Sequence, residues 1–384
     1  MKKFKRIINI FLLFILVLVL GVGGYCGYIL LSYKRIGNTS LDIDSNANKE
    51  VLKVNEAYNM ATYNIGFGSY SQDFTFFLDT VYDKDGNETC GYYSKARSKE
   101  EVYFNVNGAK DTIKGLDLDF ALLQEVDVKS TRSYKINQND IFKEALSEYD
   151  NVFSVNFDTA YLPYPLYDMH GKSLAGLSTF SRYKINDANR YEYTISDSLS
   201  KLFDIDRCFS VSSLSVENDK TLYIINSHMS AYDKGGVIRQ TQIQELNNFI
   251  SKCYNEGNYV IVGGDFNHDL LTNNPDFNYD FNNRPFNNTL KDPDWVAPYF
   301  NELKESPLVS GFKVVSSDNA PTCRNNDIEW NPSLTYKCVV DGFIVSNNVE
   351  IIEHKNIETK NGKLGLDGFA YSDHEPSYIE FKLI

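Results

Sequence analysis

The sequence contains no Lys/Arg-rich stretch interleaved with aromatic residues, and acidic side chains outnumber basic ones by 51 to 38. Residues 1–35 hold six of the basic residues and no acidic one, so the remainder of the chain has a net charge near −19. A surface this acidic repels nucleic acid unless it contains a local basic groove. We therefore expect that duplex DNA is not a partner.

Cysteine is also scarce, with six residues in the chain, five of them after residue 35. An odd number argues against a full disulfide framework, although Cys323 and Cys338 could pair if the fold brings them close. Histidine is rarer still, with five residues. Low-complexity segments are absent, and a hydrophobic content of 42% with 23% charged residues is ordinary for a globular protein.

The N-terminal segment has a different composition from the rest. A basic segment, residues 1–6, precedes a largely apolar run, residues 7–31, which is long enough to span a bilayer. A cleaved signal peptide or a buried helix remains open, but there is no clear small-x-small cleavage site. Four cations before the run and two after it predict a cytoplasmic N-terminus and an extracytoplasmic body on a single-pass cell-membrane protein. The polar residues 32–56 are typical of a flexible linker.

The rest of the chain, residues 57–384, is expected to form one domain with about a dozen strands. Two amphipathic helices are predicted, one from Asp140 to Tyr149 with Asp140 as its N-cap, and one over Ile243 to Cys253. Residues 66–115 and 270–332 lack clean periodicity and are predicted to be insertions. A dozen strands exceed one open sheet, so we expect two packed mixed β-sheets flanked by helices, an α/β (α+β) fold.

Several of the predicted strands end in a side chain that can do chemistry. The run Val260–Val262 stops at two glycines and is followed by Asp265 and Asn267, which on its own is typical of a polar turn. The same arrangement recurs at Asn64, Glu125, His228, Asp341, and Asp373 with His374. Strand ends gathered on one rim of a sheet are how open α/β proteins build an active site.

These side chains are mostly hard oxygen ligands. Mg²⁺ prefers one or two carboxylates and keeps waters that a phosphate can replace, whereas zinc requires more His or Cys than this rim offers. The set therefore indicates phosphoryl-transfer chemistry with Mg²⁺, or with Mn²⁺ in its place.

Seven segments in order resemble the endonuclease/exonuclease/phosphatase family, whose members include DNase I-like nucleases, neutral sphingomyelinases and inositol-polyphosphate phosphatases. They are Thr62–Gly66, Leu123–Asp127, Ser178–Arg182, Ser227–Met229, Gly263–Asn267, Asp341–Ile344 and Ser372–His374. The resemblance implies a four-layered sandwich and divalent-metal-dependent cleavage of a phosphate ester. The family's usual Asp-Tyr is replaced here by Asp341-Gly342.

The resemblance also implies roles for individual residues. Asn64 and Glu125 resemble metal-side ligands, with Asp373 as support. Asp265 and Asn267 resemble the pair that orients and activates water. His374 resembles the phosphate-contacting histidine, fixed by Asp341, and His228 the second histidine of the phosphodiesterase branch, placed to protonate the leaving oxygen or to stabilise the transition state.

One further residue, Arg182, is a weaker candidate, and three other histidines are not assigned to the site. Arg182 either binds phosphate or caps the sheet edge. His170 is expected in a solvated loop, and His268 and His354 receive no role. The function expected is a membrane-anchored phosphodiesterase or phosphatase acting on a lipid or another cell-envelope phosphate ester. The alternatives are a nuclease of the same family and a catalytically inactive binding ectodomain.

Overall fold

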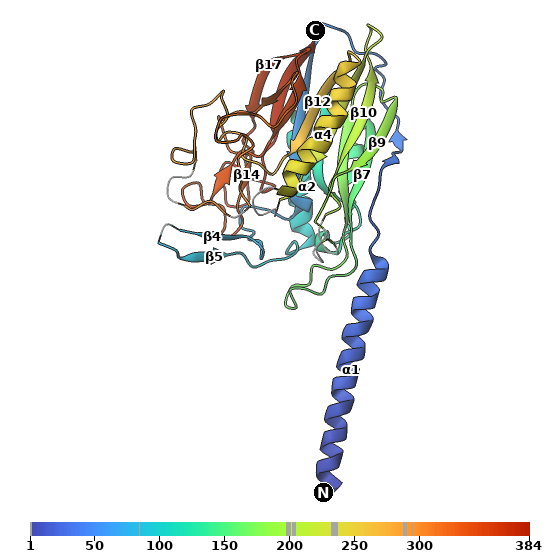
Figure 1. Cartoon of the computed structure of the whole chain (residues 1–384), viewed down its shortest axis with the longest axis vertical. Helices are drawn as coiled ribbons and strands as arrows, with labels where there is room; N and C mark the ends of the chain where they lie inside the picture. The colour runs from blue at the N-terminus through green and yellow to red at the C-terminus, as the bar shows by residue number, and fades with distance from the viewer. Residues whose placement is uncertain are drawn as a thin grey trace.

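The computed structural model describes residues 2–83, 85–196, 201, 205–231, 237–286, 290–293 and 295–384. Met1 of the basic segment, residue 84 of the first predicted insertion, and residues 287–289 and 294 of the second lie outside the described residues. Two seven-stranded sheets pack face to face, with a long N-terminal helix extending away from them (Figure 1). The expected two-sheet sandwich with flanking helices is confirmed.

The first sheet has the strand order β1-β9-β10-β11-β12-β16-β13. Its strands are β1 (Thr39–Ser40), β9 (Asp187–Glu192), β10 (Cys208–Ser215), β11 (Thr221–His228), β12 (Tyr259–Asp265), β13 (Phe312–Val315) and β16 (Asp341–Ser346). Only β11 and β12 are parallel; the other pairs run antiparallel. Tyr259–Asp265 is buried along its whole length, as its apolar run predicts.

The second sheet has the order β17-β18-β3-β6-β8-β7-β2. Its strands are β2 (Ile43–Asp44), β3 (Ala57–Asn64), β6 (Phe120–Asp127), β7 (Asp150–Asp158), β8 (Leu174–Ser181), β17 (Val349–Asn356) and β18 (Ser377–Leu383). Here β3 and β6 are the parallel pair. Two small ribbons, β4 (Thr80–Tyr82) with β5 (Glu88–Cys90) and β14 (Cys323–Arg324) with β15 (Lys337–Cys338), lie outside the sheets.

Apolar side chains from the inner faces of both sheets form the central core. Met60 and Leu122 from the second sheet meet Ile224, Ile261 and Phe343 from the first. Helix α4 (Val237–Asn255) covers the outer face of the first sheet through Ile243, Leu246 and Ile250. Helices α2 (Lys99–Gly115) and α3 (Gln138–Ala145) cover the outer face of the second. The result is a four-layered sandwich.

Helix α2 was not expected, because residues 66–115 were predicted to be an insertion. Its buried positions, among them Val102, Val106 and Ile113, are separated by polar residues and by Gly108, which weakens the periodic signal. The start of the helix does carry a sequence signal. Ser98 accepts a hydrogen bond from the backbone N–H of Glu101, three residues on, as in a capping box. The N-cap of α3 is Asn137, not the predicted Asp140.

Helix α1 (Lys2–Ser32) projects from the body and is apolar over most of its length. It is long and apolar enough to cross a membrane. The following residues, 32–56, do not hang free as a flexible linker would. β1 extends the first sheet, β2 extends the second, and Leu52 is fully buried in the central core. Backbone pairing at the sheet edges is what holds this segment in place.

Cys323 and Cys338 face each other directly across the β14–β15 ribbon as free thiols. The fold therefore brings the two cysteines close together, as a disulfide between them would require. Among the connecting segments that the structure describes, η1 (Gly66–Gly68) and η2 (Thr131–Ser133) are single turns of 3-10 helix. They contribute Phe67 and Arg132 to the region discussed next.

Candidate active site

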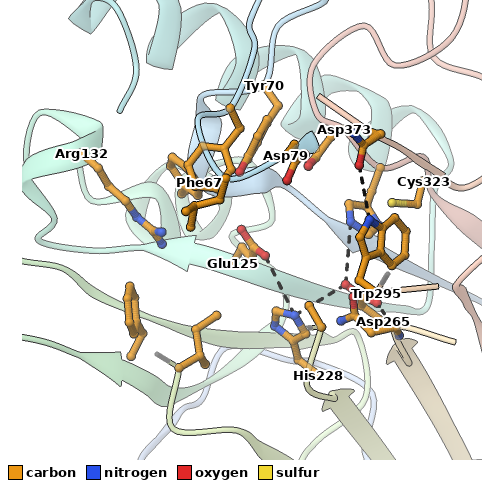
Figure 2. Close-up of a pocket in the computed structure, with 18 of the residues that line it drawn as sticks. Phe67, Tyr70, Asp79, Glu125, Arg132, His228, Asp265, Trp295, Cys323 and Asp373 are labelled. Atoms are coloured by element: carbon orange, nitrogen blue, oxygen red, sulfur yellow. Dashed lines mark hydrogen bonds and ion pairs between the residues drawn. The ribbon is translucent and has the colours of Figure 1, made fainter. Parts of the chain in front are cut away.

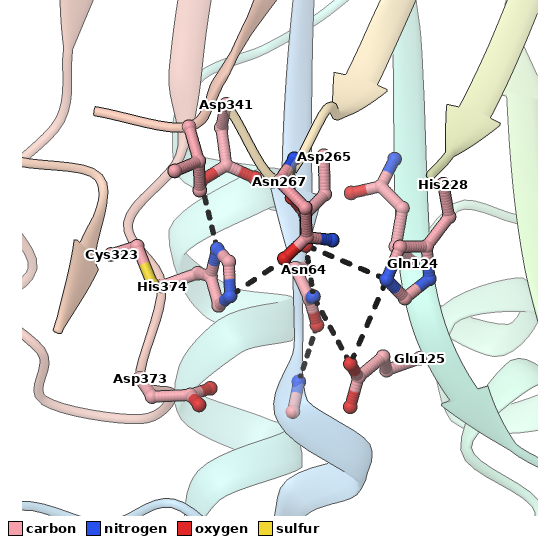
Figure 3. A network of polar contacts seen from close by, with 12 residues as sticks. Asn64, Gln124, Glu125, His228, Asp265, Asn267, Cys323, Asp341, Asp373 and His374 are labelled. Carbon is pink, nitrogen blue, oxygen red and sulfur yellow. Dashed lines mark hydrogen bonds and ion pairs between the residues drawn. The ribbon is translucent and has the colours of Figure 1, made fainter. Parts of the chain in front are cut away.

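All eight side chains predicted for the site meet at one end of the two sheets (Figure 3). They are Asn64, Glu125, His228, Asp265, Asn267, Asp341, Asp373 and His374. Within the first sheet, His228 is the register partner of Asp265, and Asp265 is the register partner of Asp341. β3 runs parallel to β6 in one sheet and β11 parallel to β12 in the other, and the hydrogen bond from Asn64 to Asp265 brings the carboxyl ends of the two pairs together on one rim.

Two glycines in β12 allow the sheets and strands to approach closely here. A Cβ at Gly264 would lie 1.9 Å from the carbonyl oxygen of Ser227, and one at Gly263 would lie 2.7 Å from the Leu122 side chain. Neither position has room for a larger residue. A Cβ at Gly342 would lie 2.9 Å from Leu270, so the tyrosine expected after Asp341 from the family pattern has no space.

The Asp265 carboxylate is the centre of the polar network. Its Oδ2 accepts a hydrogen bond from Asn64 Nδ2 at 3.0 Å and lies 3.5 Å from His228 Nε2 and 3.7 Å from His374 Nε2. Its Oδ1 accepts the backbone N–H of Asn267 at 2.9 Å. Asn267 has a left-handed φ of 50° and donates its Nδ2 to the carbonyl of Met229, which fixes the turn after the strand.

His374 and Asp341 form a buried pair on one side of Asp265. His374 Nδ1 donates to Asp341 Oδ2 at 2.8 Å, which leaves Nε2 directed toward Asp265. Burial alone would lower the pKa of His374, but the Asp341 and Asp265 carboxylates raise it well above its usual value. These carboxylates therefore favour the protonated imidazole, which can donate a hydrogen bond or a proton.

His228, on the other side, has the opposite protonation state. Burial and then the charge of Arg207 lower its pKa well below the usual value, so the ring is neutral. Its Nε2 lies 3.9 Å from Glu125 Oε1, and its Nδ1 has no hydrogen-bond partner among the described residues. Two histidines pushed toward opposite charge states are typical of an acid–base site.

Glu125 and Asp373 present carboxylates on the cavity side of the network. A β-bulge between Leu123 and Val126 and a φ of 55° at Glu125 break the strand pattern at this residue. Burial and then the charge of Asp373 raise the pKa of Glu125, and burial raises that of Asp373. In the part of the chain that the structure describes, neither carboxylate forms an ion pair with Lys or Arg. Carboxylates that lack a Lys or Arg partner suit a hard divalent cation.

A second group with metal-ligand chemistry consists of Asp265, Asp341 and His374, whose ligand atoms lie within 4.8 Å of one another. The hydrogen bond from His374 to Asp341 already occupies one atom of each, so these two residues act more readily as a proton-holding pair than as ligands. Asn64 is predicted from the sequence as a metal-side ligand, and both ends of its amide form hydrogen bonds here. Its Oδ1 accepts the backbone N–H of Gly66 and its Nδ2 faces Glu125 and Asp265, which favours a positioning role.

Six of the eight side chains, all but Asn64 and Asp341, line a cavity of about 200 Å³ (Figure 2). Its outer walls are mainly apolar, and the residues that contribute are Phe67, Tyr70, Phe76, Phe77, Leu78, Phe157, Leu162, Ile205 and Trp295. A floor of polar groups under apolar walls is typical of a small-molecule site. The shape suits a phosphate ester that carries an apolar or ring-containing group.

Arg207 is a cavity residue that the sequence analysis missed. It is 4% exposed and lines the cavity, yet its Nε and Nη1 have no hydrogen-bond partner among the described residues. By contrast, Arg132 in the same wall is held by two hydrogen bonds to Asp127 and lies over the Phe67 ring. A buried guanidinium without a partner is costly, so Arg207 is a candidate for binding a substrate anion. No local sequence signal marks it.

The remaining candidates fall outside the network. Arg182 pairs with Asp117 and donates to Tyr149, so it caps the second sheet away from the cavity. His170 is buried against the carbonyl of Ser94 and lines the cavity, which corrects its expected place in a solvated loop. His268 is buried beside Tyr299, and His354 is exposed on β17.

Comparisons with known proteins identify the family of the chain and agree with its fold. The model of the Endonuclease/Exonuclease/phosphatase family matches residues 102–374. The structure of D. rerio TDP2 complexed with single-strand DNA product aligns with a TM-score of 0.51 at 14% identity, covering 85% of this chain and 100% of that one. The structure of ANGEL2, a 2',3'-cyclic phosphatase, in complex with adenosine-2',3'-vanadate aligns with a TM-score of 0.51 at 16% identity. The alignment covers 90% of this chain and 99% of that one. No curated protein sequence matches the chain.

Proposed function

Since the chain belongs to the endonuclease/exonuclease/phosphatase family, whose members hydrolyse phosphate esters, we propose that it is a membrane-anchored, Mg²⁺-dependent phosphodiesterase or phosphatase. The observation that carries the proposal is the position of Asp265. Its carboxylate lies between His374 and His228, whose Nε2 atoms are 3.7 and 3.5 Å from its Oδ2, at the floor of a cavity large enough for a phosphate ester.

Asp265 is proposed to orient and activate the attacking water. Asn64 and the backbone of Asn267 each hold one oxygen of the carboxylate, so its direction is fixed before the substrate binds. An oriented carboxylate in a buried site needs no reorganisation during the reaction. Asn64 and Asn267 therefore act as positioning residues in this scheme.

His374 is proposed to contact a non-bridging phosphate oxygen through Nε2, while Asp341 holds the ring and keeps it protonated. His228 is neutral, which suits stabilisation of the transition state by a hydrogen bond better than proton donation to the leaving oxygen. Arg207 is proposed to pair with a second phosphate oxygen.

The cation is proposed to be held by Glu125, with Asp373 as support. When bound, a divalent cation there would offset negative charge on the phosphoryl oxygens. Two buried carboxylates without a Lys or Arg ion pair among the described residues support the presence of a divalent cation, and Mg²⁺ with its oxygen preference fits them best, with Mn²⁺ as a substitute.

Helix α1 is proposed to be an uncleaved anchor, residues 7–31, with residues 1–6 in the cytoplasm and the catalytic domain, residues 57–384, outside the cell. The length and apolarity of the helix support the span, and the excess of Lys and Arg before it supports the orientation. Protease added to intact cells should then remove the catalytic domain and leave the anchor. Protection of the domain until lysis would reverse the orientation.

The proposed substrate is a lipid or another cell-envelope phosphate ester, and the acidic charge of the body disfavours duplex DNA. The full chain in detergent micelles should hydrolyse bis-p-nitrophenyl phosphate or p-nitrophenyl phosphate with Mg²⁺, and lose this activity with EDTA. Rapid cleavage of plasmid with both small esters untouched would instead identify a nuclease. No hydrolysis of any substrate and no Mg²⁺ binding by calorimetry would indicate an inactive binding domain.

A further inference from the structure

A loop beside the cavity exposes an unusual number of large apolar and tyrosine side chains. We name residues 161–169, Tyr-Leu-Pro-Tyr-Pro-Leu-Tyr-Asp-Met, the tyrosine loop. Leu166 is 77% exposed and Tyr167 is 60% exposed, and Tyr161, Tyr164 and Met169 are exposed as well. The Tyr167 ring packs at 4.9 Å on that of Tyr92, which is also exposed. A cluster of exposed apolar side chains of this kind marks an interaction surface.

The tyrosine loop contacts helix α1 directly. Tyr25 of the helix donates its hydroxyl to the carbonyl of Tyr161 at 3.0 Å, and the Tyr161 N–H donates to the Tyr28 hydroxyl at 3.2 Å. The loop therefore lies alongside the last two turns of the helix and not above its end. Figure 1 shows green chain of this part of the body reaching down next to the upper part of α1.

The position of this contact along α1 defines its depth in a bilayer. Tyr25 follows Ile7, the first residue of the apolar run, by 18 positions, which is about 27 Å at 1.5 Å per residue. Tyr28 lies about 32 Å along. The hydrocarbon core of a bilayer is about 30 Å thick. With Ile7 at the inner boundary, both tyrosines and the tyrosine loop lie at the outer boundary, where tyrosine side chains concentrate.

A second set of contacts holds the body in this orientation. Arg35, just after α1, pairs with Asp206 at 2.6 Å, and the backbone N–H of Ile36 donates to the same carboxylate at 3.1 Å. The buried Arg190 guanidinium donates to the carbonyls of Ile36 and Gly37. These bonds restrict rotation of the catalytic domain about the end of the helix, so the loop stays on the membrane side.

The cavity opens on the same surface. Leu162 inside the loop and His170 immediately after it both line the cavity, together with Phe77 and the exposed Leu78. Phe77 packs against Tyr164 of the loop at 5.8 Å. The lining of the cavity and the tyrosine loop are thus neighbouring parts of one surface.

Charge on the loop is compatible with this placement. The loop contains one acidic residue and no basic one, and that acid, Asp168, pairs with Lys95 at 3.1 Å. No excess positive charge is present to attract anionic lipid, so contact with the bilayer would depend on apolar and tyrosine side chains.

We propose that the tyrosine loop rests in the outer interface of the membrane that α1 spans, and that the cavity takes its phosphate ester from the headgroup of a lipid in that leaflet. The inference rests on the proposed hydrolase function for its substrate half. The placement of the loop itself stands on the contacts with α1.

The placement is tested with the full chain reconstituted into phosphatidylcholine vesicles brominated just below the headgroup. The tryptophan introduced by Leu166→Trp should add fluorescence, which is obtained by subtracting the signal of the unsubstituted protein. The brominated lipids should quench this added fluorescence. The matched control is Ile352→Trp, at an exposed apolar position on β17, which Figure 1 shows at the opposite end of the body from α1. Equal quenching at the two positions, or none at residue 166, would overturn the placement.

The substrate half is tested with Leu166→Glu, a position that does not line the cavity. Hydrolysis of phospholipid in vesicles should fall about tenfold while hydrolysis of bis-p-nitrophenyl phosphate stays unchanged, because a buried charge weakens interfacial contact. Ile352→Glu should leave both hydrolysis rates unchanged. Equal loss of both activities in Leu166→Glu would show a structural role and overturn the inference.

The outcomes separate the inference from the proposed function. If the unsubstituted chain hydrolyses neither substrate, the proposed function fails, while the quenching result still decides the placement. If it cleaves the soluble ester but no phospholipid, the substrate half is wrong. A detergent-solubilised dimer that Leu166→Glu converts to monomer would assign the loop to a second copy of the chain and overturn the membrane placement.

Discussion

The Asp341 carboxylate accepts the Nδ1 proton of His374 at 2.8 Å, and this hydrogen bond joins the first strand residue of β16 to a loop residue 33 positions later. The bond fixes which imidazole nitrogen faces Asp265 and keeps the ring charged. Burial raises the pKa of Asp341 itself to about 7. The pair therefore retains a proton at the floor of the cavity.

The first prediction distinguishes the role of the Asp341–His374 pair from the role of Glu125 in binding the metal. Asp341→Asn should lower kcat by about a hundredfold or more while Mg²⁺ affinity measured by calorimetry stays nearly unchanged, because the imidazole loses its orientation and charge. Glu125→Gln should instead weaken Mg²⁺ binding directly. Equal effects of the two substitutions on Mg²⁺ affinity would contradict this division of roles.

The second prediction concerns Arg207, whose buried guanidinium has no carboxylate partner in the described residues. Arg207→Met should raise KM by about tenfold or more, since a charge-assisted bond to phosphate is lost, and should leave the melting temperature unchanged or higher. Arg190→Met is the matched control, because the Arg190 guanidinium donates to four backbone carbonyls and its loss should lower the melting temperature. A lower melting temperature in Arg207→Met would indicate a structural role.

The third prediction tests the close approach at the end of β12. Gly264→Ala places a Cβ 1.9 Å from the Ser227 carbonyl, so the two strands must separate, and the free energy of unfolding should fall by about 3 kcal/mol or more. Gly115→Ala, where a Cβ meets no atom within 4 Å, is the control and should change stability by less than about 1 kcal/mol. Thermal unfolding of both variants in one detergent gives the comparison, and similar shifts would count against the steric argument.

The fourth prediction is a pH dependence of stability from His268. Burial and the charge of Arg239 lower its pKa to about 3, below its usual value of 6.5. Between these values the unfolded chain binds a proton that the folded chain does not, so stability is complete above pH 6.5 and is lost as the pH falls. From pH 6.5 to 5 the loss from this residue should be about 2 kcal/mol.

His268→Gln should reduce the difference in unfolding midpoint between pH 7.5 and pH 5 by that contribution. His354→Gln, at an exposed position, should leave the difference unchanged. An unchanged difference in His268→Gln would show that the imidazole titrates alike in both states.

The sequence by itself determined the chemistry of the site and the class of fold. Runs such as Val260–Val262 are apolar and β-branched, and each ends in a polar residue, because a buried strand must be apolar along its length while its end reaches the rim. The residue types at Asp265, Glu125 and His374 follow from local pattern and order along the chain. The apolar run of residues 7–31 is equally local, and its length alone predicts a helix that can cross a bilayer.

Tertiary structure decided which atoms face one another. Asn64 and Asp265 are 201 residues apart, and only the packing of the two sheets turns the Asn64 nitrogen, and not its oxygen, toward the carboxylate. The sequence did not predict helix α2, because a largely polar segment becomes a stable helix only when its few apolar side chains are buried against a sheet. Arg207 and the contact between Tyr25 and Tyr161 have no signal in the sequence, since a missing partner and a contact across 136 residues exist only once the chain is folded.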